Sequence, residues 1–365
     1  MKKNNNLNDI LIQLAKLSLT GRQQDIQTYI RRLSRKIVDE FPDISTGLNA
    51  LLKEGNSVSS PLRNLSVPAI PVDRDSRLNL VRIEDPVQID INPIWDSSIE
   101  DALNQIVQEK QFEKDLLLAG LTLSKSLLFC GNPGVGKTLA ARWLSNILGL
   151  PLIILDLSAV MSSYLGRTGV NIRNVFDYAK GTNCVLLLDE LDAVAKKRDD
   201  NAELGELKRL VTVLLQEIDD WPQQNLLIAA TNHSQLLDPA IWRRFDIVVE
   251  FPMPNEEQLL KAVHLYLGKD TSKASSLIFA LVKLLDGSSF SEIEREVTRI
   301  RRLSIVKQKP IKQIILSWAK DRISSLDKDI KIDLSASLVN SGITQRKASE
   351  LTGISRDTIR KYMKT

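Results

Sequence analysis

Three short and almost wholly apolar runs mark the middle of the 365-residue chain, and polar residues follow each of them. They cover residues 127–130, 185–188 and 226–230. Apolar runs of this length, bounded by turn-forming sequences, are typical of buried strands in a parallel sheet. Longer segments between them place apolar residues at helical spacing, as over 207–218. The pattern therefore predicts an α/β fold in which helices flank a parallel sheet.

Helical periodicity also marks the two ends of the chain. Two apolar faces in the first sixty residues, separated by Gly21, predict a helix hairpin. Residues 55–95 contain five prolines, lack helical periodicity and are typical of a linker. We therefore expect an N-terminal helical domain (1–58), a linker (59–95), an α/β domain (96–251), a second helical subdomain (252–330) and a C-terminal helical unit (331–365).

The first apolar run leads into GNPGVGKT (131–138), which matches G-x-x-x-x-G-K-[ST] between a predicted strand and a predicted helix. Its glycines allow backbone N–H groups to approach phosphates, which the dipole of the following helix also favours. We expect Lys137 to reach the β- and γ-phosphates of ATP and Thr138 to offer its hydroxyl to Mg²⁺. The expected nucleotide contacts are Asn132, Pro133, Gly134, Val135, Gly136, Lys137, Thr138 and Leu139.

Carboxylates follow the second apolar run, where a parallel sheet presents ligand-binding groups. Asp189 is expected to hold the magnesium ion with Thr138, and Glu190 to orient and polarise the attacking water. Asp192 is expected in the first turn of the next helix, where the dipole favours a carboxylate. The third run ends at Asn232, which we expect beside the acidic strand as a second group that holds the water.

These motifs resemble those of AAA+ ATPases, and in particular the AAA clade of protein-remodelling and proteasome-associated motors, over about residues 96–300. The resemblance implies a P-loop ATPase module with a helical lid after residue 251. It places DPAIWRRFD (238–246) where the family keeps arginines that reach a neighbouring subunit's nucleotide, so Arg243 and Arg244 take those roles. The two are adjacent here, whereas the family separates them, and we favour Arg244 as the γ-phosphate contact. Ordinary surface arginines are the alternative.

The same resemblance implies a homo-oligomer, expected to be a hexamer, that threads protein through a central pore. Residues 162–179 resemble the family's pore loop, with Tyr164 as the aromatic residue that grips the substrate. A core tyrosine at a helix start is the alternative. Residues 196–220 resemble the second pore segment and its helix. In the lid, residues 289–293 read SFSEI where motors place Ser-Gly-Ala-Asp-Ile, so the nucleotide contacts expected there differ.

The order of motifs also resembles bacterial AAA ATPases encoded beside subtilisin-like proteases, some of them in defence loci. That likeness implies a partner protease, since this chain shows no protease triad of its own around its two histidines.

Composition fits a globular intracellular enzyme. The chain is 43% hydrophobic and 26% charged, and no apolar run approaches the roughly 18 residues of a membrane span. The opening MKKNNN imitates a secretory leader, but Asp9, Gln13 and Lys16 interrupt the apolar stretch behind it, so we expect a cytoplasmic protein. Both cysteines, Cys130 and Cys184, fall in predicted buried strands and are expected as core residues rather than a disulfide or metal pair.

The last segment, ITQRKASELTGISRDTIRKYMK (343–364), has a helix-turn-helix pattern with Gly353 at the turn. Six basic residues against two acidic ones give it a charge of +4, equal to the formal charge of the whole chain. This charge is typical of a surface that contacts DNA phosphates, although helices of this kind also serve for packing or partner contact.

Two rival functions remain open from the sequence. A DNA-acting AAA+ ATPase, such as a replication initiator, loader or transposition regulator, would use residues 343–364. An ATP-gated scaffold would assemble without processive turnover.

Overall fold

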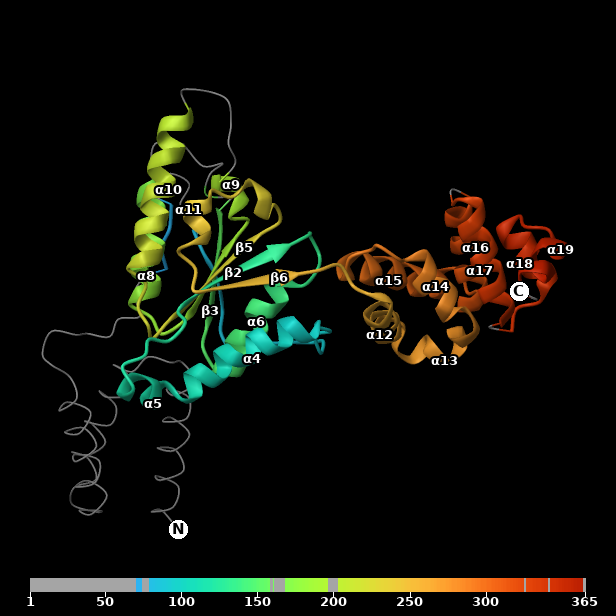
Figure 1. The fold of residues 1–365 in the computed structure, drawn as a ribbon, viewed down its shortest axis with the longest axis horizontal. Coiled ribbons are helices and arrows are strands. Elements are labelled where there is room, and N and C mark those ends of the chain that lie inside the picture. Colours follow the sequence, from blue (N-terminus) through green and yellow to red (C-terminus); the bar gives the residue numbers. More distant parts are fainter. Residues whose placement is uncertain are drawn as a thin grey trace, which may run out of the picture. The chain divides into compact units, whose positions relative to one another are not determined.

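The computed structural model describes residues 70–73, 79–157, 160, 168–195, 203–324, 326–340 and 342–363 (Figure 1). The expected N-terminal helical domain, Tyr164 and residues 196–202 of the second pore segment lie outside the described residues.

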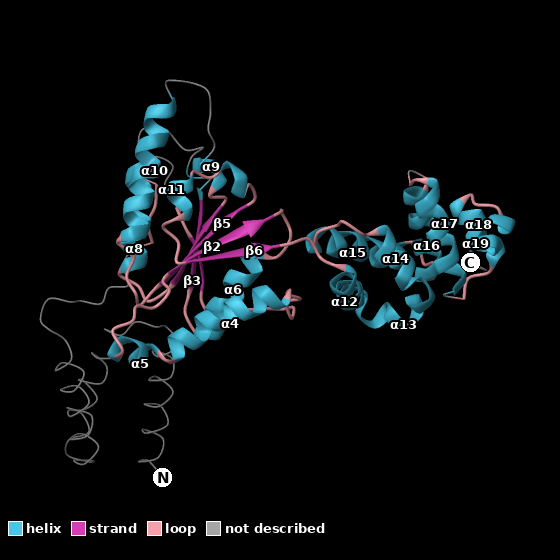
Figure 2. Cartoon of the chain, in the orientation of Figure 1, coloured by secondary structure: helices cyan, strands magenta, loops and turns pink. Residues whose placement is uncertain are grey.

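A six-stranded sheet forms the centre of the α/β region, with strand order β1-β3-β4-β5-β2-β6 (Figure 2). Five strands are parallel, and β1 joins the β3 edge in antiparallel register, Arg82 opposite Ile154. Part of the segment expected to be a linker thus adds a strand to this sheet. The strands are β1 (Arg82–Glu84), β2 (Ser126–Gly131), β3 (Leu152–Asp156), β4 (Val185–Asp189), β5 (Leu226–Thr231) and β6 (Ile247–Phe251).

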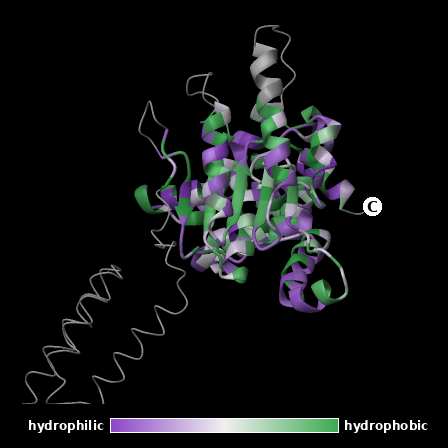
Figure 3. Ribbon diagram, turned by 90° about the vertical axis from the view of Figure 1, so that its left-hand side faces the viewer, coloured by the Kyte–Doolittle hydropathy of each residue, from purple (hydrophilic) through white to green (hydrophobic). Residues whose placement is uncertain are grey.

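The three predicted apolar runs form the adjacent strands β2, β5 and β4, which are buried on both faces. Because successive side chains of a strand point to opposite faces, Leu128 joins one core cluster and Leu127 another. Their continuous hydrophobicity is visible as green strands between helices of mixed character (Figure 3). A sheet covered by helices on both sides explains why these runs do not alternate with polar residues.

Amphipathic helices supply the two covering layers. The apolar faces of α8 and α10 pack into one cluster, and those of α4 and α6 pack into the other. The helices of this region are α4 (Ser97–Gln111), α5 (Glu113–Leu118), α6 (Lys137–Leu148), α8 (Thr168–Lys180), α9 (Asp192–Ala195), α10 (Glu203–Asp219) and α11 (Pro239–Trp242).

The remainder of the chain is helical and shares one hydrophobic cluster, which includes residues from α12 through α19. The boundary expected between residues 330 and 331 falls within the first turn of α17, so the C-terminal helices continue the core of the lid. These helices are α12 (Glu256–Leu267), α13 (Thr271–Ala274), α14 (Ile278–Leu284), α15 (Phe290–Val306), α16 (Ile311–Ile323), α17 (Lys328–Asn340), α18 (Gln345–Thr352) and α19 (Arg356–Tyr362). None of the described helices is long and apolar enough to cross a bilayer.

Candidate nucleotide site

The carboxyl ends of β2, β5 and β4 bring the sequence-predicted residues to one edge of the sheet. Because these strands are neighbours and parallel, the loop after β2, Asn232 after β5 and Asp189 at the end of β4 all lie at the same edge of the sheet. The expectation that the third apolar run lies beside the acidic strand is confirmed by the direct pairing of β4 with β5.

The loop between β2 and α6 is shaped by glycines in positive-φ conformations. Gly134 and Gly136 have φ values of 79° and 104°, and Gly136 is the residue that precedes α6. A Cβ atom on Gly131 would lie 2.3 Å from the carbonyl oxygen of Phe251. The backbone therefore turns where side chains would obstruct it, which leaves its N–H groups available at the start of a twelve-residue helix.

Lys137 is buried at the base of this loop, with 7% of its surface exposed. Its ammonium donates hydrogen bonds to the carbonyl oxygens of Gly131 (2.6 Å) and Asn132 (2.9 Å) and to Oδ1 of Asn232 (2.8 Å). All three acceptors are neutral, and no carboxylate of the described residues forms an ion pair with it. A buried cation without a counter-ion is costly, so the site favours an anionic ligand such as a phosphate chain.

The electrostatic environment of Lys137 agrees with this. Burial lowers the pKa of Lys137, and the nearby charges of Asp189 and Asp192 act in the opposite direction. The carboxylates are thus close enough to act on the ammonium through space, although they do not contact it.

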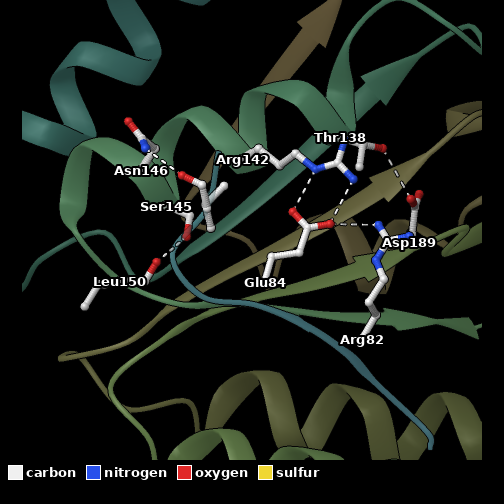
Figure 4. A network of polar contacts seen from close by, with 9 residues as sticks. Arg82, Glu84, Thr138, Arg142, Ser145, Asn146, Leu150 and Asp189 are labelled. Atoms are coloured by element: carbon white, nitrogen blue, oxygen red, sulfur yellow. Dashed lines mark hydrogen bonds and ion pairs between the residues drawn. The ribbon is translucent and has the colours of Figure 1, made fainter. Parts of the chain in front are cut away.

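Thr138 and Asp189 meet as predicted. The Thr138 hydroxyl donates to Oδ2 of Asp189 at 3.3 Å (Figure 4). A hydroxyl and a carboxylate side by side match the few protein ligands that Mg²⁺ keeps when nucleotide phosphates and water complete its shell. The described residues contain no cluster of three or more His, Cys, Asp or Glu side chains suited to a metal. The Thr138 hydroxyl and the Asp189 carboxylate are thus two neighbouring oxygen groups of the kind that could hold such an ion.

Glu190 follows in a strained conformation. Its φ is 56°, in the left-handed region that non-glycine residues rarely adopt, and its backbone N–H donates to Oδ1 of Asp189 at 3.0 Å. Glu190 is exposed. Strain of this kind persists where the surroundings fix it and often marks a functional position.

Asp192 has a second role that the sequence analysis missed. It starts α9, as predicted, but its Oδ1 also accepts from the Thr231 hydroxyl (3.0 Å) and the Asn232 backbone N–H (3.2 Å). The loop after β4 is thereby tied to the loop after β5, which fixes Glu190 relative to Asn232. Polar residues at the ends of two neighbouring strands were the signal that could have found this contact.

The helix that carries Lys137 and Thr138 is braced from the other side by residues that sequence reasoning also missed. Arg142 on α6 makes two hydrogen bonds of 2.9 Å to the Glu84 carboxylate on β1 (Figure 4). Asn146 on the same helix donates to the carbonyl of Val87 at 2.8 Å. These contacts form because the antiparallel strand is added to the sheet, so no local sequence pattern predicts them.

Arg243 and Arg244 lie away from the nucleotide loop of their own chain. Arg243 directly follows α11 as its C-terminal cap and is exposed, and the Arg244 guanidinium pairs with Asp219 at the end of α10. The carbonyl of Arg244 accepts from the Ser126 hydroxyl at 3.3 Å, at the first residue of β2. The nucleotide loop begins at the last residue of that six-residue strand, roughly 16 Å away at the rise of a β-strand. The two arginines therefore sit at the opposite end of the strand from their own chain's nucleotide loop.

Comparisons with known proteins agree with this architecture. Residues 127–253 match the family model described as ATPase family associated with various cellular activities (AAA). The uncharacterized AAA family ATPase y4kL of Sinorhizobium fredii is 34% identical over 303 residues, which cover 80% of this chain and 88% of that relative. The FIGL-1 AAA domain, a solved structure, superposes with a TM-score of 0.51 at 19% identity over 78% of this chain and 90% of its own, which shows a shared fold.

Proteasome-related proteins are also similar to this chain. A probable 26S proteasome regulatory subunit 10B of Caenorhabditis elegans is 29% identical over 70% of this chain and 65% of its own length. The proteasome-activating nucleotidase of Methanopyrus kandleri is 27% identical over 71% of this chain and 62% of its own length. The chain thus spans less than two thirds of each of these two relatives. The phosphate-binding loop, the acidic strand end and the long match to y4kL together establish that this chain belongs to the AAA family of ATPases, related to the proteasome regulatory ATPases.

Proposed function

We propose that the protein is an ATP-driven homo-oligomeric motor that remodels or threads protein substrates, with each nucleotide site completed by a neighbouring copy. The observation that carries this proposal is the placement of Arg243 and Arg244 at the far end of β2 from their own nucleotide loop. An arginine side chain spans about 7 Å, less than half of the ~16 Å that separates them. These two exposed guanidinium groups cannot reach the nucleotide site of their own chain. They are suited to contact the nucleotide bound by a neighbouring copy.

Within one site, Lys137 and the N–H groups of the loop bind the phosphates, and Thr138 and Asp189 hold Mg²⁺, which supplies charge neutralisation when bound. Glu190 orients and polarises the attacking water, and Asn232 holds the same water from the neighbouring strand. Arg243 and Arg244 of the adjacent copy offset the charge that develops on the transferred phosphoryl group. These roles rest on the contacts above and on the family resemblance.

Mixed oligomers test the shared site. A Lys137→Ala chain and an Arg243→Ala or Arg244→Ala chain should each lack ATPase activity, whereas a mixture contains some interfaces with an intact loop and an intact arginine. An arginine acts across subunits if its variant is inactive alone and regains activity on mixing with the Lys137→Ala chain. If neither mixture recovers activity at any ratio, the arginines do not act across subunits.

The protein-remodelling part of the proposal rests on the similarity to proteasome-related proteins and on Tyr164 in the sequence. We propose that Tyr164 contacts the substrate chain and that a subtilisin-like protease receives or is switched by that substrate. Tyr164→Ala should then retain basal ATPase activity but lose unfolding of a tagged test protein, with Tyr178→Phe as a control on the same segment. Full unfolding by the Tyr164→Ala variant would contradict a threading role and would favour a DNA-acting switch or an ATP-gated scaffold.

A further inference from the structure

The three C-terminal helices form a helix-turn-helix unit that the proposed motor does not use. α18 is capped by Gly353, whose φ of 73° places it in the left-handed region, and α19 begins three residues later at Arg356, behind its cap Ser355. Each helix starts with a side-chain cap: the Thr344 hydroxyl accepts from the Lys347 N–H, and the Ser355 hydroxyl accepts from the Thr358 N–H at 3.2 Å. A short turn with a left-handed glycine between two helices is typical of a helix-turn-helix unit.

The inner faces of these helices are fully used in packing. Ala348, Ile354 and Ile359 are buried in the cluster shared with the lid. Thr352 is also buried, and its hydroxyl joins the Ser335 hydroxyl of α17 (2.7 Å), the Ala348 carbonyl (2.8 Å) and the Ile354 N–H (3.3 Å). These contacts fix α18 and α19 against α17, so the outer faces contribute little to the core.

The outer faces carry a surplus of positive charge. The described residues 343–363 contain five basic side chains and two acidic ones, a net charge of +3. Arg356 and Arg360 are exposed on successive turns of α19, and Lys347 is exposed on α18. Arg360 contacts Asp357 at 3.8 Å and Gln345 at 3.0 Å, while no ion pair to Arg356 is recorded among the described residues.

We infer that this unit binds duplex DNA, with α19 placed in the major groove and the cations of α18 and α19 on the flanking phosphates. The inference rests on three properties of the unit together: the fixed angle between the helices, the outward position of α19 and the charge of the outer face. An α-helix with its side chains is about 10–12 Å wide, which matches the roughly 12 Å major groove.

The acidic side chains on this face do not prevent such binding. Asp357 has 95% of its side chain exposed, and the Arg360 side chain that faces it has 59%. Exposed pairs of this kind are weak, so Arg360 can exchange Asp357 for a phosphate oxygen at little cost. Arg356, Arg360 and Lys347 are then the residues expected to contribute most to affinity.

The experiment measures binding of the full chain, without nucleotide, to a fluorescein-labelled duplex of about 30 base pairs with a degenerate sequence. Fluorescence anisotropy gives the Kd as the salt concentration rises. If three cations contact phosphates, the logarithmic salt slope is about −2.7, so affinity falls roughly 40-fold between about 50 and 200 mM salt. Selection from the same degenerate pool then yields the duplex that the unit prefers.

The decisive variant is Arg356→Ala/Arg360→Ala, and its matched control is Lys307→Ala/Lys309→Ala, which removes two exposed charges from the loop after α15. The first should weaken binding of the selected duplex by about tenfold or more and flatten the salt slope, while the control stays within about twofold. Circular dichroism checks that both are folded. The inference is wrong if the chain does not bind the duplex or if both variants lose the same amount of affinity for it. Either result would favour a protein partner for this face. Because no nucleotide is present, that failure does not bear on the motor proposal.

Discussion

The bracing of α6 by β1 makes a quantitative prediction, because one carboxylate pairs with two arginines in different environments. Arg142 makes two hydrogen bonds of 2.9 Å to Glu84, and its side chain is 33% exposed. Arg82 makes one contact of 3.1 Å and is 62% exposed. The hydrogen bonds from Arg142 are the largest cause that lowers the pKa of Glu84. Replacement of either arginine by methionine keeps most of the aliphatic stem and removes the charge.

The magnitudes follow from this difference. A hydrogen bond to a charged group contributes about 1.5–3 kcal/mol when buried, and the partial exposure of Arg142 reduces that value. We expect Arg142→Met to lower the free energy of unfolding by about 1–3 kcal/mol. Arg82→Met should cost about 0.5 kcal/mol or less, as for an exposed ion pair. Because α6 starts at Lys137, Arg142→Met should also weaken ATP binding, whereas Arg82→Met should not.

Urea unfolding followed by tryptophan fluorescence provides the measurement, and Glu84→Gln closes a double-mutant cycle with each arginine. The coupling free energy should be about 1 kcal/mol or more for Glu84 with Arg142 and less than about 0.5 kcal/mol for Glu84 with Arg82. Equal coupling energies for the two arginines, or equal effects on ATP binding, would show that the geometry of this brace does not determine its strength.

Four further predictions concern the nucleotide site, the two cysteines and Glu84. Glu190→Gln should bind ATP but hydrolyse it at least about 100-fold more slowly, and normal turnover would exclude Glu190 as the group that orients water. Asn232→Ala should lower kcat more than it changes the Kd for ATP, whereas an equal change in both would make Asn232 a binding residue. Burial raises the pKa of Cys130 to about 11 and of Cys184 to about 12, so iodoacetamide at pH 8 should label neither thiol until urea is added. Because the folded pKa of Glu84 is lowered from 4.5, its stabilisation is present above pH 4.5 and fades as pH falls through the folded pKa; wild type and Glu84→Gln should therefore converge in stability in acid.

The structural features that depend on a local sequence pattern could be predicted from the sequence. The apolar runs before Gly131, Asp189 and Asn232 predict three adjacent strands, because strands buried on both faces consist mostly of apolar residues. The start of α6 at Lys137 and of α9 at Asp192 follows from the positions of glycine and of the carboxylate. The helix-turn-helix pattern likewise predicts α18, Gly353 and α19.

Contacts between distant segments escaped the sequence analysis. Strand β1 is three residues long in a proline-containing stretch, and its pairing with β3 depends on tertiary packing rather than on intrinsic preference. The pairing of Arg142 with Glu84 spans 58 positions in the chain and exists only because β1 adds to the sheet. The ion pair of Arg244 with Asp219 was equally invisible, since either residue alone reads as an ordinary surface charge.

The contact between Lys137 and Asn232 links nucleotide binding to the expected chemistry. In this structure the amide oxygen of Asn232 satisfies one of the three hydrogen bonds of the buried ammonium. A phosphate would compete for the same ammonium with a full negative charge, and a charge-assisted bond is the stronger of the two. We infer that ATP binding releases the Asn232 side chain from Lys137, while Asp192 continues to hold its backbone N–H. If Asn232 holds the attacking water as proposed, it can do so only after phosphate has displaced it from Lys137. For this reason we expect its replacement to affect turnover more than affinity.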